Sequence, residues 1–314
     1  MKRIILLFCL LPILLVSCSG IPKDVFYRDL YFSADGKTVT LESDQEIREV
    51  SFPKLKTETV YKAAGEESYI AYHPASDLAA ALSADHSTAT LYHTKNAEKV
   101  SEVTFDHNVL SVDFDKTGKE LLADSTDAIR AEIIDIESGE IKAELSGFTT
   151  AAPVYHVSFS PDGENVLWNA RGTFALQSIA DGSFGAQINL NDFPSVYQLS
   201  DDSAILAVSV SNETYDRYLV RFFDTASGKE IKTYECGKTP ITDLKLSENG
   251  TLYAADASSF YVFENESTEA KQIEISKNAE PGSEKAIRLF DVSPDGKSAV
   301  FLLGNNQLKK IDFE

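Results

Sequence analysis

Five histidines are the side chains of this sequence best suited to bind a metal ion or to transfer protons. They are His73, His86, His93, His107 and His156. Three of them follow one another closely between residues 86 and 107, and such a trio could hold a metal ion if the fold brought the rings together. No spacing requires that convergence, because His73 falls in a turn and His93 ends a strand. We therefore predict no metal and no cofactor.

One acidic segment, residues 113–124, has side-chain oxygens at the spacing of a calcium loop. Oxygen-bearing side chains occupy its first, third, fifth and twelfth positions, and glycine occupies the sixth. This spacing partly matches the EF-hand loop. Position twelve is Asp124 where the longer glutamate is expected, and no helical pattern flanks the segment. We predict an ordinary hairpin turn here.

Catalytic motifs are absent from the sequence. It contains no G-x-S-x-G, P-loop, H-E-x-x-H or paired C-x-x-C pattern. Cys236 has no histidine near it in sequence, so we predict a buried, small apolar side chain rather than a nucleophile. The protein is therefore expected not to be an enzyme.

The first seventeen residues have the pattern of an export signal. Lys2 and Arg3 precede an apolar run at residues 4–16. A helix of that length rises about 20 Å, too little to cross a hydrocarbon core of about 30 Å. A positive start and a short apolar run are typical of a cleaved signal peptide, which we place at residues 1–17.

The run ends in Leu-Val-Ser-Cys at residues 15–18, which resembles the lipobox of bacterial lipoproteins. The resemblance implies cleavage before Cys18 and acylation of that residue, so that several chains anchor the protein to the bilayer. An ordinary signal peptide with an incidental cysteine is the alternative. Ser19 stands where many inner-membrane lipoproteins of Gram-negative bacteria have aspartate. The resemblance thus favours the outer membrane in such a host, whereas a Gram-positive host would make the distinction void.

The net charge is −20, and loss of Lys2 and Arg3 with the signal makes it −22. Such a charge repels nucleic acid and anionic lipid headgroups. It favours cationic partners without identifying one.

A short polar turn recurs seven times, each time between an alternating strand pattern and an apolar one. Its copies begin at Ser33, His73, Asp115, Ser160, Ser200, Ser247 and Ser293. The period is near 43 residues, the length of a four-stranded propeller blade. Serine or aspartate at the first position bonds forward to the backbone, and glycine near the end accepts positive φ. The sequence therefore predicts an all-β, seven-bladed β-propeller over residues 26–314.

A second signature follows in several repeats: a strand, an aspartate and a Ser-Gly turn. It is clear at residues 131–141 and 220–231 and weaker at 175–183. With it the chain resembles WD40 and YVTN-type propeller repeats, while its Ser-Pro-Asp-Gly-Lys turns also resemble TolB-type repeats. The Gly-His pair and the tryptophan of WD40 repeats are missing. The blade-internal hydrogen bonds of that family are therefore not expected, and the subfamily stays open.

Six repeats have room for four strands, whereas the last ends at its third, residues 308–313. An unpaired edge tends to be covered. Residues 21–25, within the segment 18–25 that follows the signal, are expected to supply the missing strand. The alternative is a three-stranded last blade with residues 19–25 as a short leash.

Polar loops with aromatic residues gather on the propeller face that carries the links between blades, in repeats three to five. Tyrosine and arginine are enriched at interface hot spots. The candidate partner-binding residues are Phe148, Tyr155, Arg171, Phe193, Tyr215 and Arg217. The alternative is that these aromatics fold back and seal the gaps between blades.

These features favour a membrane-anchored, non-catalytic scaffold that binds another envelope protein or a peptide. A propeller enzyme, of lactonase or quinone-dependent dehydrogenase type, stays open because the fold does not exclude chemistry. Binding of a small ligand or glycan at the channel mouth is a third hypothesis.

Overall fold

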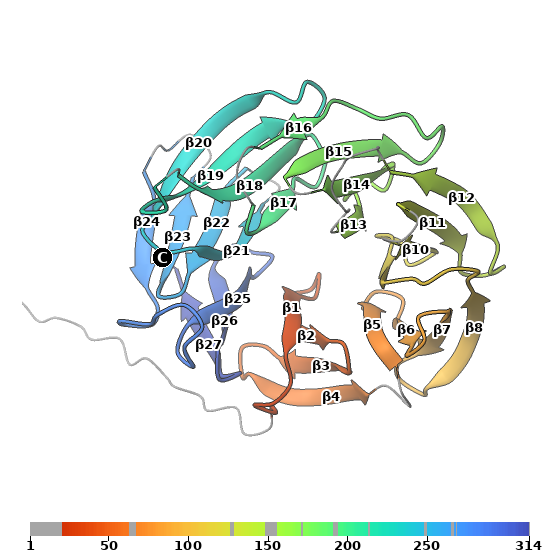
Figure 1. Cartoon of the computed structure of the whole chain (residues 1–314). Coiled ribbons are helices and arrows are strands. Elements are labelled where there is room, and N and C mark those ends of the chain that lie inside the picture. The colour runs from red at the N-terminus through yellow and green to blue at the C-terminus, as the bar shows by residue number, and fades with distance from the viewer. Residues whose placement is uncertain are drawn as a thin grey trace, which may run out of the picture.

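The computed structural model describes residues 21–62, 67–125, 129–147, 156–170, 172–190, 194–212, 214–247, 250–264, 267 and 269–313. Within these residues, twenty-seven strands form seven antiparallel sheets around a central axis, six of four strands and one of three. Figure 1 shows the ring, in which the first strand of each sheet lies innermost. The predicted seven-bladed β-propeller is confirmed. No helix long and apolar enough to cross a bilayer occurs in the described part of the chain.

Each blade takes its strands in chain order. Blades 1 to 3 consist of β1 (Tyr27–Phe32), β2 (Thr38–Ser43), β3 (Glu46–Ser51) and β4 (Lys56–Lys62); β5 (Glu67–His73), β6 (Leu78–Ser83), β7 (Thr88–His93) and β8 (Glu98–Thr104); and β9 (Ser111–Phe114), β10 (Glu120–Ser125), β11 (Arg130–Asp135) and β12 (Ile141–Ser146). Blades 4 and 5 consist of β13 (His156–Phe159), β14 (Asn165–Ala170), β15 (Thr173–Ser178) and β16 (Ile188–Asn189); and β17 (Tyr197–Leu199), β18 (Ile205–Ser211), β19 (Tyr218–Asp224) and β20 (Glu230–Gly237). Blades 6 and 7 consist of β21 (Ile241–Leu246), β22 (Leu252–Asp256), β23 (Ser259–Phe263) and β24 (Lys271–Glu274); and β25 (Ile287–Val292), β26 (Ser298–Leu303) and β27 (Leu308–Asp312).

The seven repeated turns join the first and second strands of the blades, as predicted. In blade 4 the Ser160 hydroxyl accepts the Asn165 N–H at 3.0 Å and donates to Asp162, and Gly163 has a φ of 77°. In blade 3 the Asp115 carboxylate accepts the backbone N–H groups of Thr117, Lys119 and Glu120. The acidic segment at residues 113–124 is therefore the β9–β10 hairpin, which confirms that interpretation.

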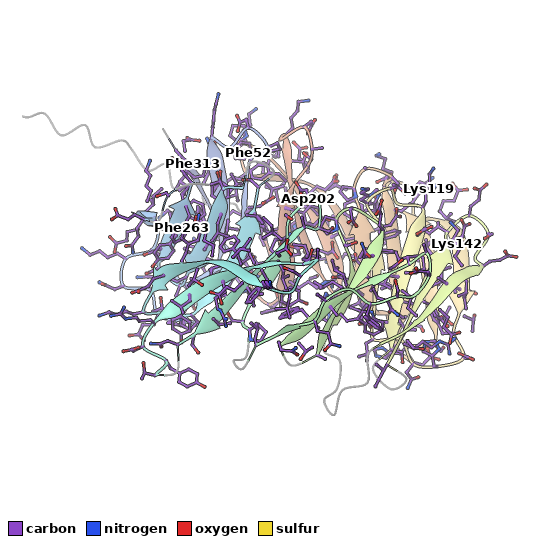
Figure 2. All side chains as sticks on the ribbon, turned by 90° about the horizontal axis from the view of Figure 1, so that it is seen from above. Phe52, Lys119, Lys142, Asp202, Phe263 and Phe313 are labelled. Atoms are coloured by element: carbon purple, nitrogen blue, oxygen red, sulfur yellow. The ribbon has the colours of Figure 1, made fainter. Side chains whose placement is uncertain are left out.

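The second strand of each blade lies between neighbouring sheets. All six residues of β26 are buried, and β10 and β14 are buried at every position but their first. Burial on both faces is what the predominantly apolar pattern after each turn predicted. Figure 2 shows the disc from the side, with Phe52 of the β3–β4 turn and Lys119 of the β9–β10 turn on the same face. The links between blades therefore belong to the opposite face.

Residues 21–25 lie against the last blade without forming a strand, so the predicted strand exchange is wrong for this segment. Blade 7 has three strands among the described residues. The Asn306 side chain donates to the carbonyls of Pro22 and Val25 at 2.6 and 2.7 Å, while Ile21 and Val25 pack on the core. Proline has no N–H to offer a ladder, and these two carbonyls are already bound. Residues 1–17 and Cys18 lie outside the described residues, so the signal peptide and the lipidation stay predictions.

The ring is closed by packing between blades 1 and 7. Leu30 and Leu41 of blade 1 share one buried cluster with Val300 and Leu302 of blade 7. The Phe32 N–H donates to Asp291 at 2.7 Å, and Arg288 donates to the Tyr27 carbonyl at 2.6 Å. Apolar burial thus replaces a shared strand as the closure of the propeller.

Candidate functional site

Four of the six predicted partner-binding residues, Phe148, Tyr155, Arg171 and Phe193, lie outside the described residues, and their role stays a prediction. The other two, Tyr215 and Arg217, lie in the loop between β18 and β19. This loop is on the face that carries the links between blades, where the sequence placed it.

The β18–β19 loop is held by one asparagine. The Asn212 side-chain oxygen accepts the N–H groups of Asp216 and Arg217 at 3.1 and 3.2 Å. Its amide nitrogen donates to Thr214 at 3.0 Å and to Asp216 at 2.6 Å. Asparagine suits such turns because its side chain mimics a backbone turn. The described part of the loop therefore has little freedom to rearrange.

Tyr215 projects from the tip of this loop. Its side chain is 71% exposed, and its φ is 56°, a conformation that few non-glycine residues adopt. A large aromatic residue held rigid and open to solvent loses little entropy on binding. Tyr215 is thus the described residue of the predicted surface best placed to contact a partner.

Arg217 contributes less positive charge than its sequence position suggested. Its guanidinium lies 3.0 Å from the Glu235 carboxylate on β20, and both side chains are more than half exposed. Exposed pairs of this kind contribute about 0–1 kcal/mol. A partner that approaches this loop therefore meets a paired arginine.

The channel mouth was left open as a ligand site by the sequence analysis, which assigned none of the residues that line the channel to it. A cavity of about 490 Å³ is lined by Asp29, Asp113, Asp243, Lys245 and other residues, most of them on the first strands. The sequence feature that could have identified these lining residues is a charged residue two or four positions before a repeated turn, as at Asp113 and Asp243. Side chains at these positions of the innermost strands converge on the axis.

Two channel carboxylates also join neighbouring blades. Asp243 accepts the N–H of Phe290 in blade 7 at 2.9 Å, and Asp291 accepts that of Phe32 in blade 1 at 2.7 Å. Burial raises the pKa of Asp243 to about 6, although Lys245 opposes the shift. Burial alone would lower the pKa of Lys245, but Asp243 and the other channel aspartates raise it above its ordinary value. The channel therefore keeps its lysine charged.

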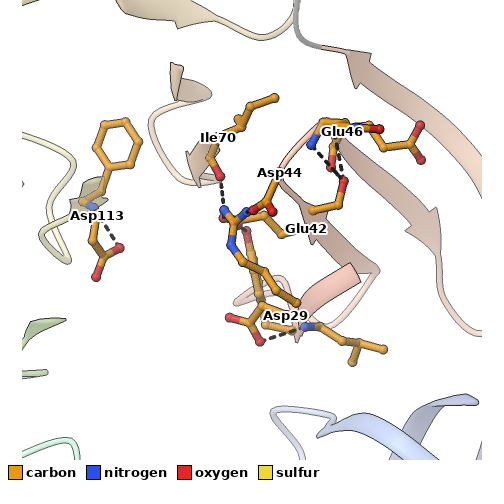
Figure 3. A network of polar contacts seen from close by, with 12 residues as sticks. Asp29, Glu42, Asp44, Glu46, Ile70 and Asp113 are labelled. Atoms are coloured by element: carbon orange, nitrogen blue, oxygen red, sulfur yellow. Dashed lines mark hydrogen bonds and ion pairs between the residues drawn. The ribbon is translucent and has the colours of Figure 1, made fainter. Parts of the chain in front are cut away.

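Arg28 connects blades 1 and 2 beside the channel (Figure 3). Its guanidinium contacts Glu42 and Asp44, both at 2.5 Å, and donates to the Ile70 carbonyl of β5. It also lies 4.0 Å from the centre of the Tyr69 ring. Burial raises the pKa of Glu42, against the opposing effect of Arg28. The Arg28 guanidinium is therefore already paired with groups of the protein itself.

Replacing Asp113 by asparagine is expected to stabilise the protein at about pH 8 by about 1 kcal/mol, and the gain should vanish near about pH 4. Desolvation among the surrounding strands raises the pKa of Asp113 to about 6, against about 3.9 in an unfolded chain, but the side chain still faces water in the channel, which reduces the energy involved. The folded state binds the extra proton between these values, so the wild type loses stability as the pH rises through this window. Asparagine stays neutral and can still accept the Phe114 N–H. Urea unfolding at the two pH values measures the difference.

The matched control is Asp35→Asn, for which we expect the opposite change in stability. Lys37 and Ser33 hold the pKa of the exposed Asp35 carboxyl at about 2, so its charge is favourable in the folded state. This substitution should cost stability at neutral pH. An equal gain from Asp113→Asn at both pH values would contradict the assignment of the raised pKa.

The described residues hold one thiol, Cys236, and it is buried at the end of β20, as predicted. Burial raises its pKa to about 12, so it stays a protonated thiol at neutral pH. His156 opens onto the channel, and burial lowers its pKa. The described histidines do not form a shared cluster, although His107 lies close to two carboxylates.

No protein-family model matches the chain, and no curated protein shows a significant match.

Proposed function

We propose that this chain is a lipid-anchored, non-catalytic scaffold that binds an envelope protein or a peptide through the face that carries its blade links. The observation that supports it is Tyr215, which is 71% exposed on a loop fixed by Asn212. Aromatic anchors of this kind supply much of the energy of protein interfaces. A propeller ring provides the rigid support that such a contact needs.

The membrane part of the proposal rests on Cys18. Only Ser19 and Gly20 separate it from Ile21, which packs on the core that closes the ring. Three residues span at most about 11 Å, so an acylated Cys18 would hold the propeller close to the bilayer. In a Gram-negative host we propose the periplasmic side of the outer membrane, since Ser19 replaces the retaining aspartate.

Cys18→Ala should move the protein from the membrane fraction to the soluble fraction and abolish labelling by a fatty-acid probe. Several acyl chains give stable anchoring, and without them the acidic surface has no affinity for anionic lipid. Cys236→Ala, the other cysteine beyond the signal, is the control and should stay membrane-bound and labelled. An unlabelled wild type, or a labelled Cys18→Ala, would contradict the anchor.

Tyr215→Ala should weaken partner binding at least tenfold, the loss expected of an interface hot spot. The purified full chain and its variants are immobilised, and the proteins retained from solubilised envelopes are quantified. Ile231→Ala is the control, because Ile231 is an exposed apolar residue on β20 of the same blade. Equal retention by Tyr215→Ala and wild type would argue against this face as the binding surface.

A second candidate function is binding of a small cationic ligand in the channel. The cavity of about 490 Å³ has a size common among ligand sites, and Asp29, Asp113 and Asp243 line it. A polyamine such as spermidine is the probe. Its affinity should fall below about pH 6, where Asp113 and Asp243 take up protons, and should drop in an Asp113→Asn variant. Stoichiometric calcium retained through dialysis would instead favour a propeller enzyme.

A further inference from the structure

Three potential metal ligands meet where the link from blade 2 to blade 3 crosses the sheet of blade 3. Asp106 and His107 belong to the link between β8 and β9, and Glu132 belongs to β11. One ligand atom from each of the three lies within 4.8 Å of the others. The strand register places Ser125 and Glu144 on the same sheet face as Glu132. The cluster is thus built by the link between blades 2 and 3 and by the sheet of blade 3.

Two atoms of this cluster are buried acceptors without a partner. The His107 Nδ1 lies 2.8 Å from Asp106 Oδ1. A carboxylate only accepts, so Nδ1 carries the proton and the lone pair of the neutral ring is on Nε2. That Nε2 is buried and has no hydrogen-bond partner among the described residues, and neither has Oε2 of Glu132, a residue 1% exposed. A buried acceptor left unpaired costs about 1–3 kcal/mol, and more when it is charged.

Charge points to a cation as the missing partner. The Arg130 guanidinium contacts Glu132 and lies 3.1 Å from Glu144 and 3.6 Å from Asp106. Three carboxylates thus share one guanidinium, which leaves two negative charges uncompensated around a buried glutamate. A divalent cation would neutralise them and satisfy both unpaired acceptors.

We propose that His107, through Nε2, and Glu132 bind a divalent first-row transition metal ion, such as zinc, that fastens the blade 2 link to blade 3, while Asp106 orients the His107 ring and water completes the coordination. An imidazole with carboxylates suits zinc better than calcium, which prefers oxygen ligands. Ligand atoms around zinc lie about 3.3 Å apart, so the side chains must move inward by about 1 Å. Asp106 stays hydrogen-bonded to Nδ1 of His107, on the far side of the ring from the ion. Its bond to Nδ1 is the usual support of a metal-binding histidine.

The test uses the full mature chain after treatment with a chelator, titrated with cobalt(II) and then with zinc. We expect one cobalt per chain with visible absorption bands, displacement by zinc, and a higher melting temperature with zinc. Glu132→Gln and His107→Gln should each lower the affinity at least tenfold. His156→Gln, which removes the channel histidine, is the matched control and should bind like the wild type.

Several outcomes would overturn the proposal. They are a wild type that binds neither ion, equal affinity in all the variants, or loss of binding in His156→Gln alone. X-ray absorption of zinc bound to the wild type needs no variant, and so decides the matter even if Glu132→Gln fails to fold. One imidazole among oxygen ligands is expected, because the cluster holds one histidine, and two or more would exclude this site.

Discussion

Replacing Trp168 by alanine is expected to lower the free energy of unfolding by about 3–5 kcal/mol, the cost of removing a large aromatic side chain from a core. Trp168 lies on β14, is 0% exposed, and packs in the cluster between blades 3 and 4 with Leu145 and Val157. The cavity cannot collapse, because sheets on both sides hold its walls. Urea unfolding followed by circular dichroism measures the loss.

Trp168→Phe is the control that separates volume from polarity. The indole Nε1 donates to Gln177 at 2.9 Å, and Gln177 in turn donates to the carbonyls of Gly182 and Ser146. Phenylalanine keeps most of the volume and leaves the Gln177 oxygen unpaired, so it should cost about 1–3 kcal/mol. If alanine cost no more than phenylalanine, the packing argument would fail.

The blades could be predicted from the sequence because each depends on local chemistry. Ser160 and Gly163 build their turn with neighbours at most five residues away, and the same bonds recur at Ser293 and Gly296. The number of these turns predicted the number of blades, and their period predicted four strands in each. The predicted strand exchange failed because the carbonyls of residues 22 and 25 bond to residue 306 instead, a contact between the two ends of the chain that no local pattern reveals.

The sites were harder to predict because they join residues from separate blades. The partner of Arg217 is Glu235, and their pairing depends on an irregular register between β19 and β20. The channel aspartates come from blades 1, 3, 6 and 7, and each looks like a polar strand residue when seen alone. His107 and Glu132 are brought together only when the blade 2 link packs on blade 3.

Arg48→Leu is expected to destabilise the protein by about 3–5 kcal/mol, because it leaves a buried carboxylate without its cation. Arg48 and Glu46 lie 2.8 Å apart, with side chains 6% and 3% exposed. Tyr27, which is fully buried, donates its hydroxyl to the same carboxylate. The exposed Lys62 is 3.9 Å from Glu46, too far and too well hydrated to replace the guanidinium.

The double variant Glu46→Gln/Arg48→Leu tests whether the loss comes from the orphaned charge. Replacing both members of a buried pair removes the desolvated carboxylate, so the double variant should be more stable than Arg48→Leu alone. The destabilisation by Arg48→Leu should extend to the closure of the ring. Arg288 of blade 7 binds the backbone carbonyl of Tyr27, and the Tyr27 hydroxyl donates to Glu46. Hydrogen exchange in Arg48→Leu should therefore accelerate in β1 and β26 before it does in blade 4. Uniform acceleration around the ring, or a double variant no more stable than the single one, would show that the pair does not hold the closure.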